Sequence, residues 1–156
     1  VVATLMLSEM AAYYNSIGTT VYKELNKLYD KYGWFVEETI AITKQGKDGL
    51  EEIGRIMENL RTHEHEEVAG RKVEYYKDFK LQVEKNMKTG KTSKIDLPKS
   101  DVIQFILEDG TYVTARPSGT EPKIKYYICV VDKTKEKSLA KLEDIKSGFQ
   151  TYVDSL

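Results

Sequence analysis

The chain has 156 residues, of which 40% are hydrophobic and 31% are charged, and its formal net charge is −1. This balance is typical of a globular protein and excludes a disordered chain. The near-neutral charge and the short apolar runs predict neither a nucleic-acid partner nor a membrane partner. The single cysteine, Cys129, excludes an internal disulfide, and we expect a reducing, cytoplasmic location with this residue in the core.

The chain begins in an apolar pattern, Val1 to Leu7, that neither an initiator Met nor an N-cap residue precedes. We therefore expect a piece of a longer protein. Apolar residues at helical spacing predict a first helix over residues 2–15, which Gly18 ends. A second helix is predicted to start at Thr19 or Thr20 and to run to about residue 31.

The next segment, residues 34–43, is rich in β-branched and aromatic residues and predicts a strand. A turn over residues 44–47 and a third helix capped by Asp48 should follow. One strand among three helices cannot form a sheet. It must pair with the second part of this chain or with a part of the protein that is missing here.

Residues 61–70 are charged and poorly periodic, and we place a domain boundary inside them, between residues 66 and 67. The pair His63 and His65, with neighbouring glutamates, could bind a metal. However, the run lacks the ligand spacing of a closed site, and a solvated linker is the preferred interpretation.

The second part predicts a small antiparallel sheet. A long irregular connection is expected over residues 85–101, and Asp109-Gly110 is a strong hairpin signal. A final amphipathic helix should follow Asp132. The predicted fold class is thus α+β, with a helical part followed by a sheet whose helices lie on one face. The predicted strands are 71–79, 102–107, 111–115 and 123–131.

Between two of these strands lies the loop Arg116-Pro117-Ser118-Gly119-Thr120-Glu121-Pro122, which offers several groups suited to phosphate. A guanidinium forms a planar fork of donors, two hydroxyls flank a glycine that leaves backbone N–H groups accessible, and two prolines stiffen the ends. Lys123 and Lys125 add positive potential. An ordinary turn with Arg116 on the surface has a similar composition, so composition alone does not distinguish a phosphate-binding loop from an ordinary turn.

The run from Arg116 to Tyr126 resembles the C-terminal phosphate-binding loop of the α-D-phosphohexomutases, the phosphoglucomutase/phosphomannomutase family. Residues 7–14, 28–33 and 53–61 resemble closing helices of that family's third domain. The resemblance covers essentially the whole chain. It implies the end of domain three, residues 1–66, followed by the complete C-terminal domain, residues 67–156, with a phosphoglucomutase C-terminal domain-like fold.

By this resemblance, Arg116, Ser118, Gly119, Thr120 and Lys125 bind the phosphate of a hexose phosphate that is not being transferred. Pro117, Glu121, Pro122 and Lys123 form the loop scaffold. The family's phosphoserine, Mg²⁺ and sugar-reading loops are absent from this sequence, so we expect no catalytic residue, no metal ligand and no cofactor in this chain. The longer enzyme would use Mg²⁺ and a hexose 1,6-bisphosphate, and the remaining mutase domains would be this chain's partners.

The expected function is therefore a part of an isomerase that moves phosphate intramolecularly between the 1- and 6-positions of a hexose. We expect the chain alone to be inactive. The alternative is a free-standing, non-catalytic module that binds a partner protein and keeps the loop only as structure. The sequence does not give the sugar preference.

Overall fold

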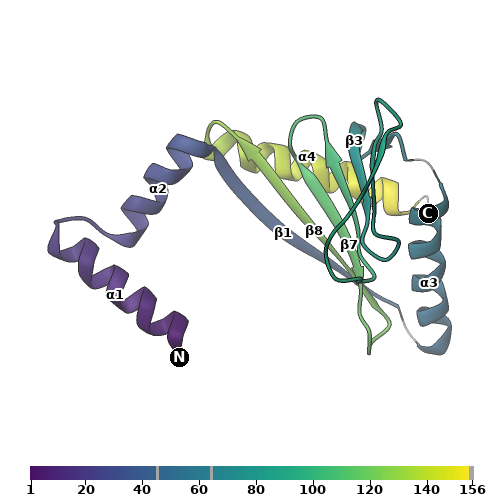
Figure 1. Cartoon of the computed structure of the whole chain (residues 1–156), viewed down its shortest axis with the longest axis horizontal. Helices are drawn as coiled ribbons and strands as arrows, with labels where there is room; N and C mark the ends of the chain where they lie inside the picture. The colour runs from purple at the N-terminus through teal and green to yellow at the C-terminus, as the bar shows by residue number, and fades with distance from the viewer. Residues whose placement is uncertain (45, 64, 155–156) are drawn as a thin grey trace.

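The computed structural model describes residues 1–44, 46–63 and 65–154. Figure 1 shows the sheet with α3 and α4 as one body and α1 with α2 as an arm that lies away from it. The elements in chain order are α1 (Val2–Ser16), α2 (Val21–Tyr32), β1 (Trp34–Thr43), α3 (Gly46–Thr62), β2 (Glu67–Val68), β3 (Arg71–Asp78), β4 (Val83–Asn86), β5 (Thr92–Lys94), β6 (Ile103–Leu107), β7 (Tyr112–Pro117), β8 (Lys123–Asp132) and α4 (Lys135–Asp154).

Within these residues the sheet is antiparallel and has eight strands: seven follow the order β1-β8-β7-β6-β3-β4-β5, and β2 pairs with β3 beside this path. Strand β1 pairs with β8 over its whole length, from Trp34 opposite Asp132 to Thr43 opposite Lys123. The strand that could not form a sheet by itself therefore pairs with the second part of the chain. This confirms one of the two partners expected for it.

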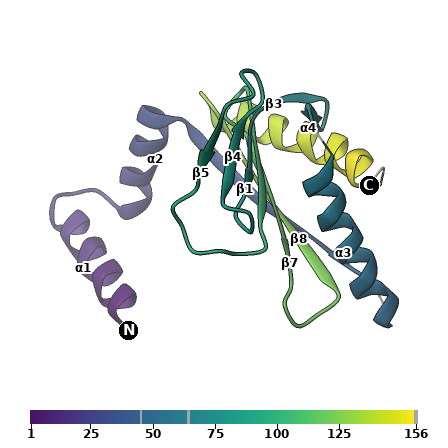
Figure 2. The same ribbon diagram turned by 45° about the vertical axis from the view of Figure 1, so that its right-hand side comes forward.

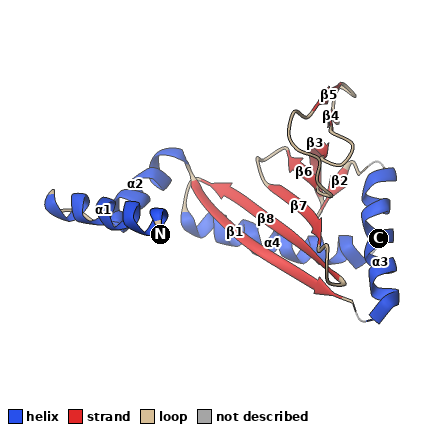
Figure 3. Ribbon diagram, turned by 60° about the horizontal axis from the view of Figure 1, so that its bottom comes forward, coloured by secondary structure: helices blue, strands red, loops and turns tan. Residues whose placement is uncertain are grey.

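Helices α3 and α4 cover one face of the sheet, as predicted. Figure 3 shows the opposite face of β1, β8 and β7 with α4 behind these strands. Strand residues alternate between the two faces, so every second side chain of β6, β7 and β8 enters the core while most of its neighbours stay partly exposed, the buried Cys129 excepted. The largest fully buried side chains include Tyr126, Phe105, Phe149, Leu60 and Ile145.

One core extends across the predicted boundary between residues 66 and 67. Ile56 and Leu60 of α3 belong to the same buried cluster as Ile128 of β8 and Ile145 of α4. The sheet likewise joins β1 to strands that follow residue 67. In this chain, the segment from β1 to α4 therefore shares one core. The boundary between residues 66 and 67 concerns the domains of a longer protein and stays a prediction.

Local signals explain how the arm meets the sheet. The Thr20 hydroxyl caps α2 by accepting a hydrogen bond from Lys23 N at 3.2 Å. Gly33 follows α2 with φ of 106°, and a Cβ at this position would lie 2.7 Å from Val131 Cγ2. Glycine is therefore required where the arm ends and β1 begins, because a side chain would meet both backbone strain and β8.

One predicted feature of the third helix needs correction. Helix α3 begins at Gly46, so Asp48 lies in its first turn and is not its N-cap. An acidic residue in the first turn still interacts favourably with the helix dipole. Gln45, in the predicted turn, lies outside the described residues.

The connection predicted as irregular contains two strands, β4 and β5. Strand β5 is exposed along its whole length, so its sequence lacks the alternation that identifies a half-buried strand. The hairpin between β4 and β5 depends on Asn86, whose carbonyl accepts from Gly90 N at 2.8 Å and whose side chain accepts from Thr89 N at 2.9 Å. Gly90 has φ of 70°.

The charged run is also more ordered than a solvated linker. The His65 ring lies 5.5 Å from the Phe105 ring, edge to face, and its Nδ1 lies 2.9 Å from the Tyr152 hydroxyl. Glu64 lies outside the described residues. In the described part of the chain, none of the helices is both long and apolar enough to cross a bilayer.

Candidate anion-binding site

The loop between β7 and β8 is closed by its own backbone. Ser118 N donates to the Lys123 carbonyl at 2.7 Å, and Lys123 N donates to the Glu121 carbonyl at 2.7 Å. The Ser118 hydroxyl oxygen accepts from Thr120 N at 3.4 Å and from Glu121 N at 3.3 Å. Ser118 thus shapes the loop, and its hydroxyl hydrogen still has a direction in which to donate.

The loop is also attached to the rest of the fold. Figure 2 shows that it extends beyond the end of the sheet. Lys44 N, just after β1, donates to the Pro122 carbonyl at 2.8 Å. The Lys44 ammonium lies 2.7 Å from the Glu52 carboxylate on α3. These contacts position the loop relative to two elements besides the strands that it connects.

Two cations lie directly opposite each other where the loop leaves the sheet. The register pairs Arg116 of β7 with Lys125 of β8, so both side chains lie on the face that the helices leave open. Like charges directly opposite each other on neighbouring strands destabilise a sheet. Neither cation forms an ion pair with any described residue, whereas Lys44, Lys77, Lys141 and Lys146 all do. The pair therefore lacks a counter-ion in the described part of the chain.

A hollow of about 180 Å³ lies beside this pair. At Gly119 a Cβ would meet nothing within 4 Å, and φ lies outside the left-handed region. Packing within the chain therefore does not require glycine there. The absence of a side chain at Gly119 leaves its backbone N–H accessible, and this N–H forms no hydrogen bond with the described residues. The hollow is lined by Arg116, Pro117, Ser118, Gly119, Lys125 and Tyr127.

The structure thus brings together Arg116, Ser118, Gly119 and Lys125 of the predicted phosphate ligands, with Pro117 of the predicted scaffold. Thr120 belongs to the same loop but does not line the hollow, and neither do the scaffold residues Glu121, Pro122 and Lys123.

Tyr127 was not predicted as a site residue. The sequence places it among apolar strand residues, where it resembles Tyr126, a fully buried side chain. The signal that could have identified it is its spacing. It follows Lys125 by two residues on the same strand and therefore lies on the same face.

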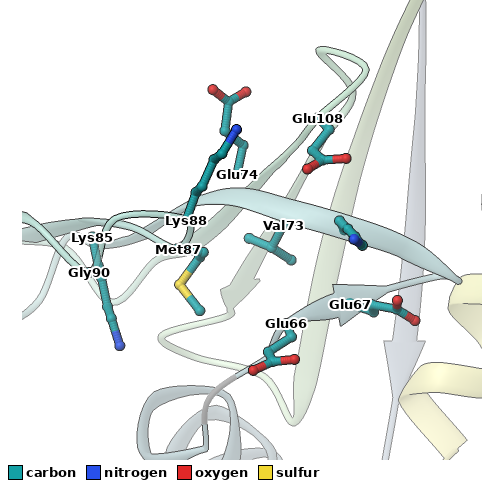
Figure 4. A pocket seen from close by; sticks show the side chains of 10 residues that line it. Glu66, Glu67, Val73, Glu74, Lys85, Met87, Lys88, Gly90 and Glu108 are labelled. Atoms are coloured by element: carbon teal, nitrogen blue, oxygen red, sulfur yellow. The ribbon is translucent and has the colours of Figure 1, made fainter.

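A larger hollow, of about 810 Å³, lies elsewhere, between β2, β3, β4 and the β6–β7 turn (Figure 4). Its lining mixes four carboxylates with three ammonium groups, a balance that does not favour a phosphate dianion. Within the described residues, no group of three or more His, Cys, Asp or Glu side chains is arranged to hold a metal ion.

Cys129 is 3% exposed, so it is buried as predicted, but it lies opposite Glu37 and Tyr112 on the open face of the sheet. Burial raises the pKa of the Cys129 thiol, while a hydrogen bond from Tyr112 acts in the opposite direction. A thiol that is buried and mainly protonated is a poor nucleophile.

The fold and this hollow define a small antiparallel-sheet domain that presents a cationic loop suited to an anion. The family model of the phosphoglucomutase/phosphomannomutase C-terminal domain matches residues 21–146. The chain therefore belongs to the phosphoglucomutase/phosphomannomutase family, through its C-terminal region.

Individual relatives agree with this assignment. A phosphoglucomutase from Staphylococcus saprophyticus is 38% identical over 110 residues, covering 70% of this chain and 20% of that protein. A phosphoglucomutase from Staphylococcus aureus is 35% identical over 111 residues, with 71% and 20% covered. The chain thus spans about a fifth of the length of the curated relatives that it matches.

Among solved structures, the chain is similar to the exocytosis-sensitive phosphoprotein pp63/parafusin, a phosphoglucomutase from Paramecium, in its open form. The TM-score is 0.47 at 15% sequence identity, with 84% of this chain and 22% of that chain covered.

Proposed function

We propose that this chain is the C-terminal portion of a longer phosphohexomutase and that its β7–β8 loop binds the phosphate of a hexose phosphate that is not being transferred. The opposed cations Arg116 and Lys125 carry this proposal, because they lie side by side with no counter-ion among the described residues. A phosphate dianion between them would replace their repulsion by two charge-assisted contacts. The accessible N–H of Gly119 would add a third.

The role assigned to the loop is positioning. In an intramolecular transfer between the 1- and 6-positions, the bisphosphate must turn around so that either phosphate can occupy this loop. Contacts made only to phosphate oxygens tolerate both orientations of the sugar, while the fixed loop geometry limits the entropy lost on binding. We assign Ser118 and Thr120 to the same phosphate, with Pro117, Glu121, Pro122 and Lys123 maintaining the loop.

The chemistry itself is assigned to the rest of the longer protein. We expect Mg²⁺, a phosphoserine and a hexose 1,6-bisphosphate to act there, in a reducing cytoplasm, and this chain alone to lack mutase activity. If purified chain converted glucose 1-phosphate to glucose 6-phosphate in a coupled assay, the assignment of chemistry to the missing part would be wrong.

The α1–α2 arm supports the view that further protein surrounds this chain. Neither helix has a buried residue, and exposed fractions of Leu5, Met6 and Leu7 are 64%, 65% and 55%. These three consecutive residues point in different directions around a helix. A helix that is apolar on all sides is normally enclosed. We assign its cover to the remaining mutase domains.

The same exposed arm also favours the alternative function, a free-standing module that docks on a partner protein through it. The two functions differ in their dependence on the loop. The alternative function would be supported if the chain formed a stable complex with another protein, if Arg116→Ala left that complex unchanged, and if the chain did not bind phosphate.

The decisive experiment is a titration of the isotopically labelled chain with inorganic phosphate, followed through the backbone amide of Gly119. We expect saturable shifts that Arg116→Ala weakens about tenfold or more, because a charge-assisted hydrogen bond is lost. Arg55→Ala, which removes an exposed arginine from α3, is the matched control and should leave the affinity unchanged. Equal losses in both variants would show only a general charge effect.

A further inference from the structure

The open face of the sheet continues beyond the two cations as an ordered row of hydroxyl groups. In the register of β1, β8 and β7, Thr39, Tyr127 and Thr114 lie opposite one another. The row before it consists of Ala41, Lys125 and Arg116. Residues two apart on a strand share a face and lie about 7 Å from each other. A neutral, hydroxylated row therefore lies next to the cationic row.

Tyr127 joins two hollows on this face. It lines the hollow of about 180 Å³ that contains Arg116 and Lys125. It also lines a neighbouring hollow of about 460 Å³, together with Thr39 and Tyr112. A ligand whose phosphate lay between the cations would therefore have space to extend past the Tyr127 ring without leaving the sheet surface.

The hydroxyl groups of this row are available for a ligand. The Tyr127 side chain is partly exposed, and its hydroxyl forms no hydrogen bond with any described residue. The Thr114 oxygen accepts from Gln104 Nε2 at 3.0 Å, which leaves the Thr114 hydroxyl hydrogen free to donate. Thr39 is exposed on β1. Together they offer an aromatic ring edged by donors and acceptors, the combination that binds a polyol.

The charges on this face determine which ligand groups the hollow of about 460 Å³ can bind. Its far end holds the Glu37 carboxylate, which accepts a hydrogen bond from the Tyr112 hydroxyl at 3.5 Å. A second anion placed there would meet this carboxylate. The part of a ligand that lies over Tyr127 must therefore be neutral, and any second phosphate must point away from the sheet.

We infer that Tyr127, flanked by Thr39 and Thr114, contacts the sugar that carries the bound phosphate. Tyr127 is thereby a ligand-contacting residue that gives this chain a preference for a hexose phosphate over inorganic phosphate. The inference rests on the proposed phosphate site, because it assigns the position of the neutral part of the same ligand.

The test compares two ligands on the whole chain, inorganic phosphate and glucose 1-phosphate, by amide shift titration. We expect the sugar phosphate to bind about fivefold to tenfold more tightly, since one or two neutral hydrogen bonds are added. Tyr127→Ala should remove this preference and leave phosphate binding intact. The matched control is Tyr75→Ala, which removes a partly exposed tyrosine from β3 on the same face and should keep the preference.

A second measurement keeps the result independent of any folding defect in Tyr127→Ala. Cross-relaxation from the Tyr127 ring protons to the glucose protons should be seen in the unmodified chain, and Tyr127→Phe should retain the ring contact while losing part of the preference. Equal affinity for both ligands in the unmodified chain would overturn the inference and leave the phosphate site standing. Absence of binding by either ligand would overturn both.

Discussion

The arm and the sheet body bury their apolar residues to very different extents. Leu142 of α4 is 4% exposed, whereas Leu5 of α1 is 64% exposed, although both are leucines on helices. The difference shows that helical spacing alone does not decide burial. A helix needs a facing surface, which the sheet provides for α3 and α4, and which the described residues do not provide for α1. Four pairs of substitutions test the role of such a surface, from the largest expected effect to the smallest.

The largest effect should come from breaking the buried ion pair of the body. Asp78 is fully buried and accepts from Arg61 Nε at 3.1 Å, while its other oxygen accepts from the backbone of Lys80 at 2.8 Å. Asp78→Ala leaves the guanidinium, 8% exposed, with Asp101 as its remaining ion-pair partner, and removes the acceptor of the Lys80 and Leu81 backbone N–H groups. It should lower the free energy of unfolding by about 3–5 kcal/mol.

The control lies in the arm. Lys27 forms an ion pair with Glu24 at 2.7 Å, and its side chain is 70% exposed. Lys27→Ala should change the unfolding free energy by about 0.5 kcal/mol or less, because solvent screens such pairs. Both values can be measured by urea unfolding. A loss in the arm as large as that in the body would contradict the contrast.

The next test uses the two leucines themselves. Leu142→Ala removes packing from a filled core and should cost about 2–5 kcal/mol. Leu5→Ala removes a side chain that the body does not cover, and alanine favours the helix, so the change should stay within about 0.5 kcal/mol. Urea unfolding followed by the fluorescence of Trp34, the single tryptophan, measures both. Similar losses in the two variants would show that the arm folds with the body.

A smaller effect is expected where α4 approaches a turn closely. A Cβ at Gly148 would lie 3.0 Å from the Ala69 carbonyl oxygen, in the turn between β2 and β3. Gly148→Ala should therefore cost about 1–3 kcal/mol in thermal or urea unfolding. At Gly54 of α3 a Cβ would meet nothing within 4 Å. Gly54→Ala should stabilise the chain by about 0.5–1 kcal/mol. A loss of stability in Gly54→Ala would show that the close approach of Ala69 does not explain the effect at Gly148.

The smallest effect concerns pH. Burial lowers the pKa of His65 from its usual value of 6.5, opposed by the hydrogen bond to the Asn59 carbonyl. The unfolded chain therefore takes up a proton at a higher pH than the folded chain. Stability should fall as pH decreases below about 6.5 and level off below the folded pKa. His65→Gln should reduce this slope in unfolding curves measured between pH 7 and pH 5. His63→Gln, at an exposed position, should reduce it less, because the charge of His63 contributes less to the lowered His65 pKa than burial does.

The sequence predicted β1 with the bounds that the structure shows. Its run of β-branched and aromatic residues starts directly after Gly33 and stops before Lys44. It also predicted the Asp109-Gly110 hairpin, where Gly110 has φ of 81°. It missed β4 and β5, since neither strand alternates between buried and exposed side chains. Local residue patterns succeed where a strand is half-buried and fail where pairing alone holds it.

The same limit applies to the site. The residues of the loop were identified because they are consecutive and chemically unusual. Tyr127 was missed because it resembles the apolar strand residues around it, although its spacing from Lys125 places it on the same face. The opposition of Arg116 and Lys125 was missed because it depends on the register between β7 and β8. Register is a property of two strands, and a single strand's sequence does not contain it.

Strand β1 has a consequence for handling the protein. It lies at one end of the strand order, so its ten residues pair only with β8 among the described strands. The opposite edge strand, β5, has three exposed residues, a short polar edge of the kind that discourages further pairing. A long edge rich in β-branched residues can add the strand of another molecule. We expect concentrated solutions of this chain to grow fibrillar aggregates through β1.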